Sequence, residues 1–189
     1  LLGAGERHGA DAVRWTVAGL SDPVPARPQR VVLPGYGVRR AHPFSFSDQY
    51  TVRRTLGVPE ATTRLCLDSR LLTAALFAVR RLGFLRGSRF PGRRRLLTRA
   101  FSRVHLGGDG FVVRVDARRG DRHAVRALTG RGQGRVSGLV AAYVTRAVLE
   151  GGVPAGVRHI EQVPVLADLP EQLAVHGVTV HGSVNEARR

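Results

Sequence analysis

Apolar side chains recur at helical spacing in several stretches of the chain. In the clearest, residues 136–148, they follow one another at intervals of three and four, and Gly151 comes where a helix would end. The same spacing predicts a helix over residues 71–85, for which Asp68 or Ser69 could serve as the N-terminal cap. Weaker helical patterns occupy residues 10–20, 51–56, 93–104 and 166–177.

Apolar and polar positions alternate, as in a half-buried strand, most regularly over residues 111–118. Apolar side chains fall on one face there, and charged ones, including Arg114 and Asp116, fall on the other. A tight connection at residues 119–121 is expected to return the chain as a second strand over residues 122–128, so that the two form a hairpin. Further strands are predicted over residues 30–34, 62–68, 156–166 and 178–184, and a loop over residues 35–50.

Together these elements predict an α+β fold with a mixed, largely antiparallel sheet and helices packed on one face. Residues 1–189 are expected to form a single domain. Within it, residues 1–27 are predicted to be a linker helix and a proline-rich loop, and residues 28–165 the core. Residues 166–189 would add a C-terminal helix and strand.

The chain is strongly basic, because 30 arginines face 14 acidic residues and no lysine is present, for a net charge of +16. The arginines are scattered, and the 6% of aromatic residues are not interleaved with them as base-stacking platforms would be. We therefore interpret the charge as a solvated basic surface. Binding of an acidic partner, a lipid surface or a nucleic acid through arginines is the alternative.

Cysteine and methionine, which are rare or absent in this chain, indicate its cellular compartment and whether it is part of a longer protein. Cys66 is the single cysteine, which excludes an internal disulfide, and it lies in an apolar run typical of a buried, inert thiol. We see no signal peptide and no apolar run near the roughly 20 residues of a membrane span, so a cytoplasmic protein is predicted. Methionine is absent, and we expect the chain to be a segment of a longer protein.

A glycine-rich turn over residues 130–137 joins the hairpin to the longest predicted helix. Gly132, Gly134 and Ser137 approximate the G-x-G-x-x-G/A pattern that holds a dinucleotide pyrophosphate at a helix N-terminus. The preceding strand belongs to a hairpin, however, and no acidic residue ends a second strand about 20 residues on. We therefore expect no cofactor site here: the glycines should let a strand turn into a helix, which leaves these three residues as weak cofactor candidates.

Three segments carry a resemblance to a known family. They are HPFSFSDQYTVRRTLGVP, TTRLCLDS and, most specifically, LTGRGQGRVSGLVAAYVTRAVLEGGVPAGVRHIEQV. The chain resembles the C-terminal part of the saccharopine dehydrogenase-like oxidoreductases over most of residues 10–165. In that family a strand passes through a small-residue turn into an alanine- and leucine-rich helix, and a GV…EQ segment follows.

The resemblance implies a substrate-side or lid-type domain of an NAD(P)-dependent oxidoreductase that transfers hydride to or from a carbonyl or imine carbon. NAD(P) would be bound mainly by an N-terminal Rossmann domain, which has no counterpart in this chain. Expected partners are therefore that missing domain and a small-molecule substrate, and the chain alone is expected to be inactive. An anionic surface and a second copy of the chain stay open as further partners.

Candidate substrate-binding residues lie in the polar segment 42–54. His42 could exchange a proton near neutral pH, Asp48 and Tyr50 could orient a substrate, and Arg54 could bind a carboxylate. A surface or capping role is the competing interpretation for each. The sequence does not single out a catalytic residue, and no histidine spacing indicates a metal site.

Overall fold

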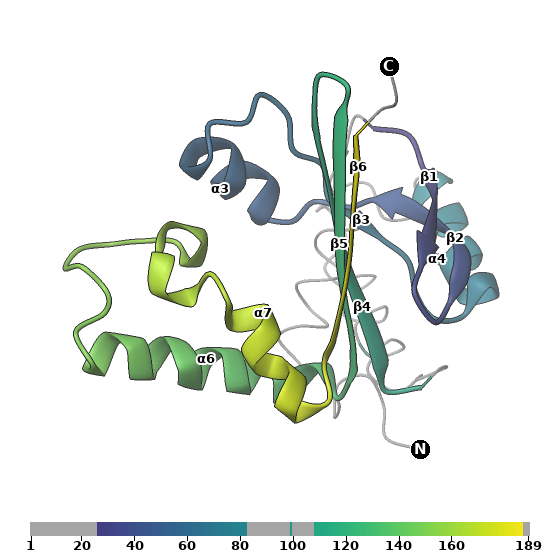
Figure 1. The fold of residues 1–189 in the computed structure, drawn as a ribbon. Coiled ribbons are helices and arrows are strands. Elements are labelled where there is room, and N and C mark those ends of the chain that lie inside the picture. Colours follow the sequence, from purple (N-terminus) through teal and green to yellow (C-terminus); the bar gives the residue numbers. More distant parts are fainter. Residues whose placement is uncertain (1–25, 83–98, 100–107, 187–189) are drawn as a thin grey trace. The chain divides into compact units, whose positions relative to one another are not determined.

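A computed structural model describes residues 26–82, 99 and 108–186 (Figure 1). The helix predicted over residues 10–20 lies outside the described residues, as does the one over residues 93–104 apart from Arg99. The chain divides into two compact units. Unit 1 is Leu1–Val31 with Val38–Gly108, and unit 2 is Val32–Gly37 with Asp109–Arg189. That the chain works as one domain stays a prediction.

The first sheet has the strand order β1-β2-β3, with β1 at Gln29–Leu33, β2 at Gly37–Pro43 and β3 at Arg64–Leu65. The predicted strands in β1 and β3 are confirmed, β3 being shorter than expected. The loop prediction was wrong for β2. Its inward positions carry Ala41 and Pro43, both buried, and such small or ring-locked residues do not produce the alternation of large apolar side chains that marks a strand in a sequence.

Unit 1 contains two helices, α3 (Asp48–Thr55) and α4 (Arg70–Arg81). The Ser69 hydroxyl accepts a hydrogen bond from the Leu72 amide at 3.1 Å, which confirms the predicted cap of α4. Helix α4 buries Leu76 and Phe77 against Phe44, whose side chain is fully buried. These three residues form the small core of unit 1.

Unit 2 is built on a sheet of the order β4-β5-β6, with β4 at Gly110–Arg119, β5 at Arg122–Arg131 and β6 at Thr179–Glu186. Strand β5 lies between the other two and is antiparallel to both (Figure 1). The predicted hairpin is confirmed. Gly120 occupies its turn with φ of 58°, a conformation that glycine adopts without steric cost.

Helix α6 (Gln133–Leu149) follows β5 directly and confirms the strongest helical pattern in the sequence. It ends as predicted, with Gly151 at a φ of 74°. The predicted strand over residues 156–166 was wrong, because this stretch forms two short 3₁₀ turns, Ile160–Gln162 and Pro164–Leu166. Pro164 has no N–H to donate to a strand ladder, and the Gln162 side chain accepts a hydrogen bond from the His159 amide at 3.0 Å.

The predicted C-terminal helix appears as α7 (Leu169–Gln172) and the 3₁₀ turn Leu173–His176, and the chain then enters β6. Side chains from α6 and from these short elements pack together with Phe111 and Leu128 of the sheet. The buried members of this core are Val136, Ala147, Val163, Leu166, Leu169, Leu173 and Val178. The protein is therefore α+β as predicted, with its strands divided between two antiparallel sheets instead of one mixed sheet.

Candidate functional site

The sheet of unit 2 has two chemically different faces. The register pairs Phe111 with Gly130 and Val113 with Leu128, and this face packs toward α6. The alternate positions point the other way and carry titratable and polar side chains from all three strands. We call this second set the polar face, and it comprises Arg114, Asp116, His123, Thr129 and His181.

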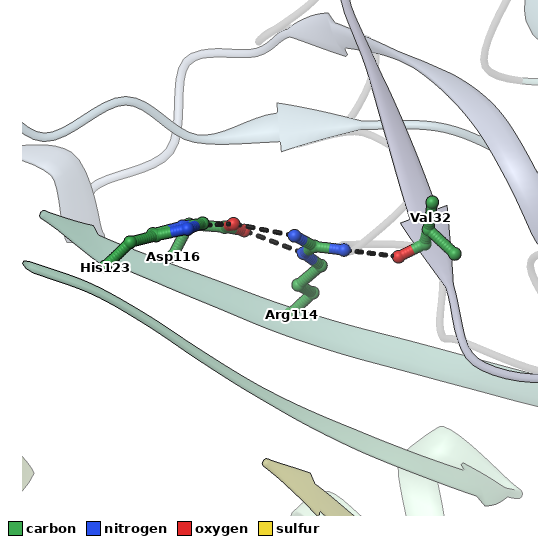
Figure 2. Close-up of polar contacts among 4 residues, drawn as sticks. All are labelled: Val32, Arg114, Asp116 and His123. Carbon is green, nitrogen blue, oxygen red and sulfur yellow. Dashed lines mark hydrogen bonds and ion pairs between the residues drawn. The ribbon is translucent and has the colours of Figure 1, made fainter. Parts of the chain in front are cut away.

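Asp116 of the polar face lies between Arg114 and His123 (Figure 2). Its carboxylate accepts two hydrogen bonds from Arg114, one from Nε at 2.8 Å and one from a terminal nitrogen at 2.7 Å. The other terminal nitrogen of Arg114 donates to the backbone carbonyl of Val32 at 2.5 Å. Arg114 thus connects the carboxylate to Val32 near the end of β1, and the segment Val32–Gly37 belongs to the same unit as Arg114.

The charge state of the pair follows from these bonds. Hydrogen bonding by Arg114 is the main reason that the pKa of Asp116 lies below its ordinary value, and smaller contributions come from His123. The same hydrogen bond raises the pKa of Arg114. Both groups are charged at neutral pH, and Asp116 can therefore only accept hydrogen bonds.

His123 lies beside this carboxylate, with its Nε2 at 3.2 Å from Asp116 Oδ1. Because an ionised carboxylate has no proton to donate, Nε2 must carry the hydrogen, and Nδ1 of the neutral ring then holds a lone pair. The His123 side chain is 29% exposed, so a proton can reach it. An aspartate that orients an imidazole and stabilises its protonated form is a common arrangement for proton transfer.

A second histidine lies on the same face. His181 of β6 has its Nε2 at 2.8 Å from the hydroxyl of Thr129 on β5. The polar face therefore holds one histidine bonded to a carboxylate and another bonded to a hydroxyl. This arrangement can bind a polar group and exchange protons with it.

The residues predicted for substrate binding lie in unit 1 and do not form one cluster. His42 stacks on Phe77 with ring centroids 4.0 Å apart, and burial, with Arg40 and Arg80 adding repulsion, lowers its pKa. Tyr50 is 64% exposed, and Arg54 is also exposed. None of these three, nor Asp48, forms a hydrogen bond or ion pair with another of the four, all of which are described.

Asp48 begins α3, where its carboxylate accepts hydrogen bonds from the Gln49 amide and the Thr63 hydroxyl, each at 2.9 Å. The first bond satisfies an amide at the start of the helix, and the second ties the helix to the segment before β3. Asp48 therefore has the structural role that competed with substrate binding.

The weak cofactor candidates are placed at the start of α6. Gly132 has φ of 67° and precedes the helix, while Gly134 and Ser137 are exposed on its first turns. The Gly132 amide donates to the Asp109 carbonyl at 2.9 Å. That amide is occupied within the protein, and the strand before it runs antiparallel to both neighbours, unlike the parallel strand of a dinucleotide-binding turn.

Sequence reasoning placed Arg114 and Asp116 on one face of a strand but did not connect them with His123. A hairpin turn centred on Gly120 fixes the register, and the register pairs Arg118 with His123 and Asp116 with Val125. All four positions share a face, so the position of the turn was the signal that could have placed His123 beside Arg114 and Asp116. The residue types alone could not have shown that these side chains are neighbours.

Among the described residues, no group of three or more His, Cys, Asp and Glu side chains could hold a metal ion, and no helix is long and apolar enough to span a membrane. No family model, curated protein or solved structure matches the chain. These comparisons add no support to the resemblance to saccharopine dehydrogenase-like oxidoreductases, which stays a prediction.

Proposed function

We propose that this chain is the substrate-side part of a cytoplasmic NAD(P)-dependent oxidoreductase of the saccharopine dehydrogenase-like type, acting on a carbonyl or imine carbon. One structural observation supports this beyond the sequence resemblance. The sheet of unit 2 is closed on one face by α6 and its core, while the other face presents His123 held by Asp116. A domain that contributes groups to a reaction centre needs accessible polar side chains on a rigid support, and the His123 side chain is 29% exposed.

The nucleotide itself is assigned to a domain outside this chain. The turn that most resembles a phosphate-binding loop does not fit that role here, because the Gly132 amide is already bonded to Asp109. The contribution of this chain would be the binding of substrate and the handling of a proton. His123 would hold that proton at Nδ1, and Asp116 would stabilise the charged ring at Nε2.

Arg114 is a positioning residue in this proposal. All three of its guanidinium nitrogens are engaged, two by Asp116 and one by the Val32 carbonyl. It therefore orients the carboxylate and is not free to clamp a substrate acid. His181 and Thr129, on the same face, would hold a polar group of the substrate.

The parent reading frame upstream of Leu1 tests the class directly. We expect it to encode a strand followed by Gly-x-Gly-x-x-Gly, and an upstream sequence without any nucleotide-binding pattern would contradict the proposal.

A second test is titration of NADPH into the chain alone, followed by nicotinamide fluorescence, which should show no binding at micromolar concentration. Micromolar binding would mean that the turn at residues 130–134 holds phosphate after all.

In the full parent protein, His123→Gln should lower kcat by roughly 10²- to 10⁴-fold, the range for loss of a general acid or base. It should also remove a limb of the pH–rate profile. His159→Gln is the matched control, because His159 is exposed and lies outside the polar face. Equal activities of the two variants would exclude His123 as the proton donor.

A further inference from the structure

Strand β6 forms one edge of the sheet in unit 2 (Figure 1). Its eight residues, Thr179–Glu186, pair with β5 along their whole length. Within the part of the chain that the structure describes, no strand pairs with the other side of β6. Backbone N–H and C=O groups on that side are therefore left without a strand partner, and such a row of groups can accept a further strand.

The two edges of this sheet differ in their protection against pairing. Strand β4, at the opposite edge, has four charged side chains in ten residues: Arg114, Asp116, Arg118 and Arg119. Charged residues on an edge strand discourage its pairing with another chain. Strand β6 has no proline and no charged residue before Glu186, and residues 172–185 are the longest stretch of the sequence without arginine, aspartate or glutamate. The β6 edge therefore lacks the features that keep sheets apart.

A second copy of the chain fits this edge better than a flexible peptide does. A peptide would lose backbone entropy at every residue that it orders, whereas β6 of a second copy is already held extended by its own β5. Peptide sites at strand edges also use pockets for alternate side chains of the peptide. The core under α6 includes Val178 but no described side chain of β6, so the packing of α6 does not extend along this strand to form one wall of such a site.

We propose that β6 pairs antiparallel with β6 of a second copy, a property beyond the proposed oxidoreductase function. The pairing would join two three-stranded sheets into one sheet of six strands. A two-fold axis beside Gly182 would place no like charges opposite each other. Across that axis the residue pairs would be Thr179 with Asn185, Val180 with Val184, and His181 with Ser183 of the second copy. Because edge β4 is protected by its charges, the association should stop at a dimer.

The test is sedimentation velocity of the full 189-residue chain between about 1 µM and about 300 µM, at several salt concentrations. Pairing along one strand buries less than the roughly 1,600 Å² of a standard interface, so we expect a weak dimer with a micromolar dissociation constant. The dimer should strengthen as salt is added, because salt screens the repulsion between two chains that each carry a net charge of +16.

Lysines on β6 should prevent the pairing. The triple variant Thr179→Lys, Gly182→Lys and Asn185→Lys places like charges opposite each other in three cross-strand pairs, and it should weaken association at least about tenfold. The matched control adds the same charge to exposed positions of α6, through Gly138→Lys, Ala141→Lys and Thr145→Lys. This control should change association much less. Circular dichroism melting would verify that both variants fold.

A charge swap separates loss of the interface from loss of structure. Replacing the same three β6 positions by glutamate should also weaken self-association. An equimolar mixture of the lysine and glutamate variants should associate more tightly than either variant alone, because opposite charges then lie across the two-fold axis. A mixture no tighter than its components, or equal losses in the β6 and α6 lysine variants, would overturn the proposal.

Two further outcomes would overturn it as well. Oligomers larger than a dimer would require a second free edge. A chain that stays monomeric at every concentration would exclude the dimer, and slow hydrogen exchange of all β6 amides in that monomer would indicate that another segment of the same chain covers the edge.

Discussion

The two compact units build their cores and place their histidines in different ways. In unit 1 the described core is Phe44, Leu76 and Phe77. The strands of the first sheet, β1, β2 and β3, are short. In unit 2 two ten-residue strands form a hairpin, and one long helix covers a larger core. The unit with the longer regular elements is also the one whose elements the sequence pattern predicted most accurately.

The two units also place a histidine in different chemical surroundings. His42 of unit 1 lies against Phe77 near two arginines, an environment that lowers its pKa and favours the neutral ring. His123 of unit 2 lies beside the ionised carboxylate of Asp116. The same residue type thus stacks on an aromatic ring in one unit and hydrogen-bonds to a carboxylate in the other.

The contrast between the units is most strongly tested by removing one side chain from each core. Phe44→Ala should lower the free energy of unfolding by about 3–5 kcal/mol and Leu173→Ala by about 2–5 kcal/mol, because both side chains are buried. Hydrogen exchange should show the loss of protection in β2 and α4 for the first variant, and in α6 and β5 for the second. Identical losses throughout the chain in both variants would mean that the two cores unfold as one.

A pair of glycine substitutions sharpens the account of α6, the element that distinguishes unit 2. Gly132→Ala should destabilise the protein by about 1–2 kcal/mol, since an alanine at a φ of 67° is strained. Gly138→Ala should stabilise it by about 1 kcal/mol, because Gly138 lies within the helix with nothing within 4 Å of an added Cβ. Chemical denaturation measures both. A stabilising Gly132→Ala would contradict a left-handed Gly132 before the first turn of α6, and a destabilising Gly138→Ala would contradict open space around Gly138.

The smallest expected effect concerns the polar face. Asp116→Asn should cost about 1 kcal/mol at pH 7, a value reduced for solvent screening because Asp116 is 37% exposed. The folded protein binds a proton at Asp116 less readily than the unfolded chain does. The stabilisation is therefore complete above the ordinary pKa of 3.8 and is lost as the pH falls through the lower folded value.

Urea denaturation between pH 2.5 and 7 would follow this effect. The stabilities of the unaltered chain and of the Asp116→Asn variant should differ at neutral pH and converge in acid. Asp121→Asn is a suitable control, because Asp121 lies in the exposed turn and has no ion pair among the described residues. A difference that persists at the lowest pH would show that the Asp116 carboxylate does not carry the effect.

The fold was predictable where one continuous segment contains the whole signal. The alternation in β4 and the helical stripe of α6 each lie within a single stretch, and Gly120 and Gly151 mark their ends. Strand β2 was missed because its pairing partners, and not its own side chains, make it a strand. Residues 156–166, before α7, were wrongly predicted as a strand from their alternating apolar and polar positions. Pro164 and the hydrogen bond between His159 and Gln162 favour 3₁₀ turns there instead.

The candidate site was less predictable than the fold. His42, Asp48, Tyr50 and Arg54 were chosen because they are polar residues in an expected loop, yet part of that segment is strand and helix. The polar face depends on the hairpin register and, for His181, on a strand that joins the sheet only after the intervening helices. Contacts between residues so distant in the sequence leave no local pattern from which to infer them.

Strand β6 completes its sheet by pairing with β5, and Thr129 meets His181 across 52 positions of sequence. During synthesis, the edge of β5 that β6 will occupy must therefore stay unpaired until the ribosome has made all of the intervening chain. An open strand edge is a template for pairing with other molecules. Nascent chains of this protein should depend on chaperones most strongly in that interval. Release of the chain from a chaperone should no longer risk pairing of the β5 edge with other molecules once β6 has emerged from the ribosome.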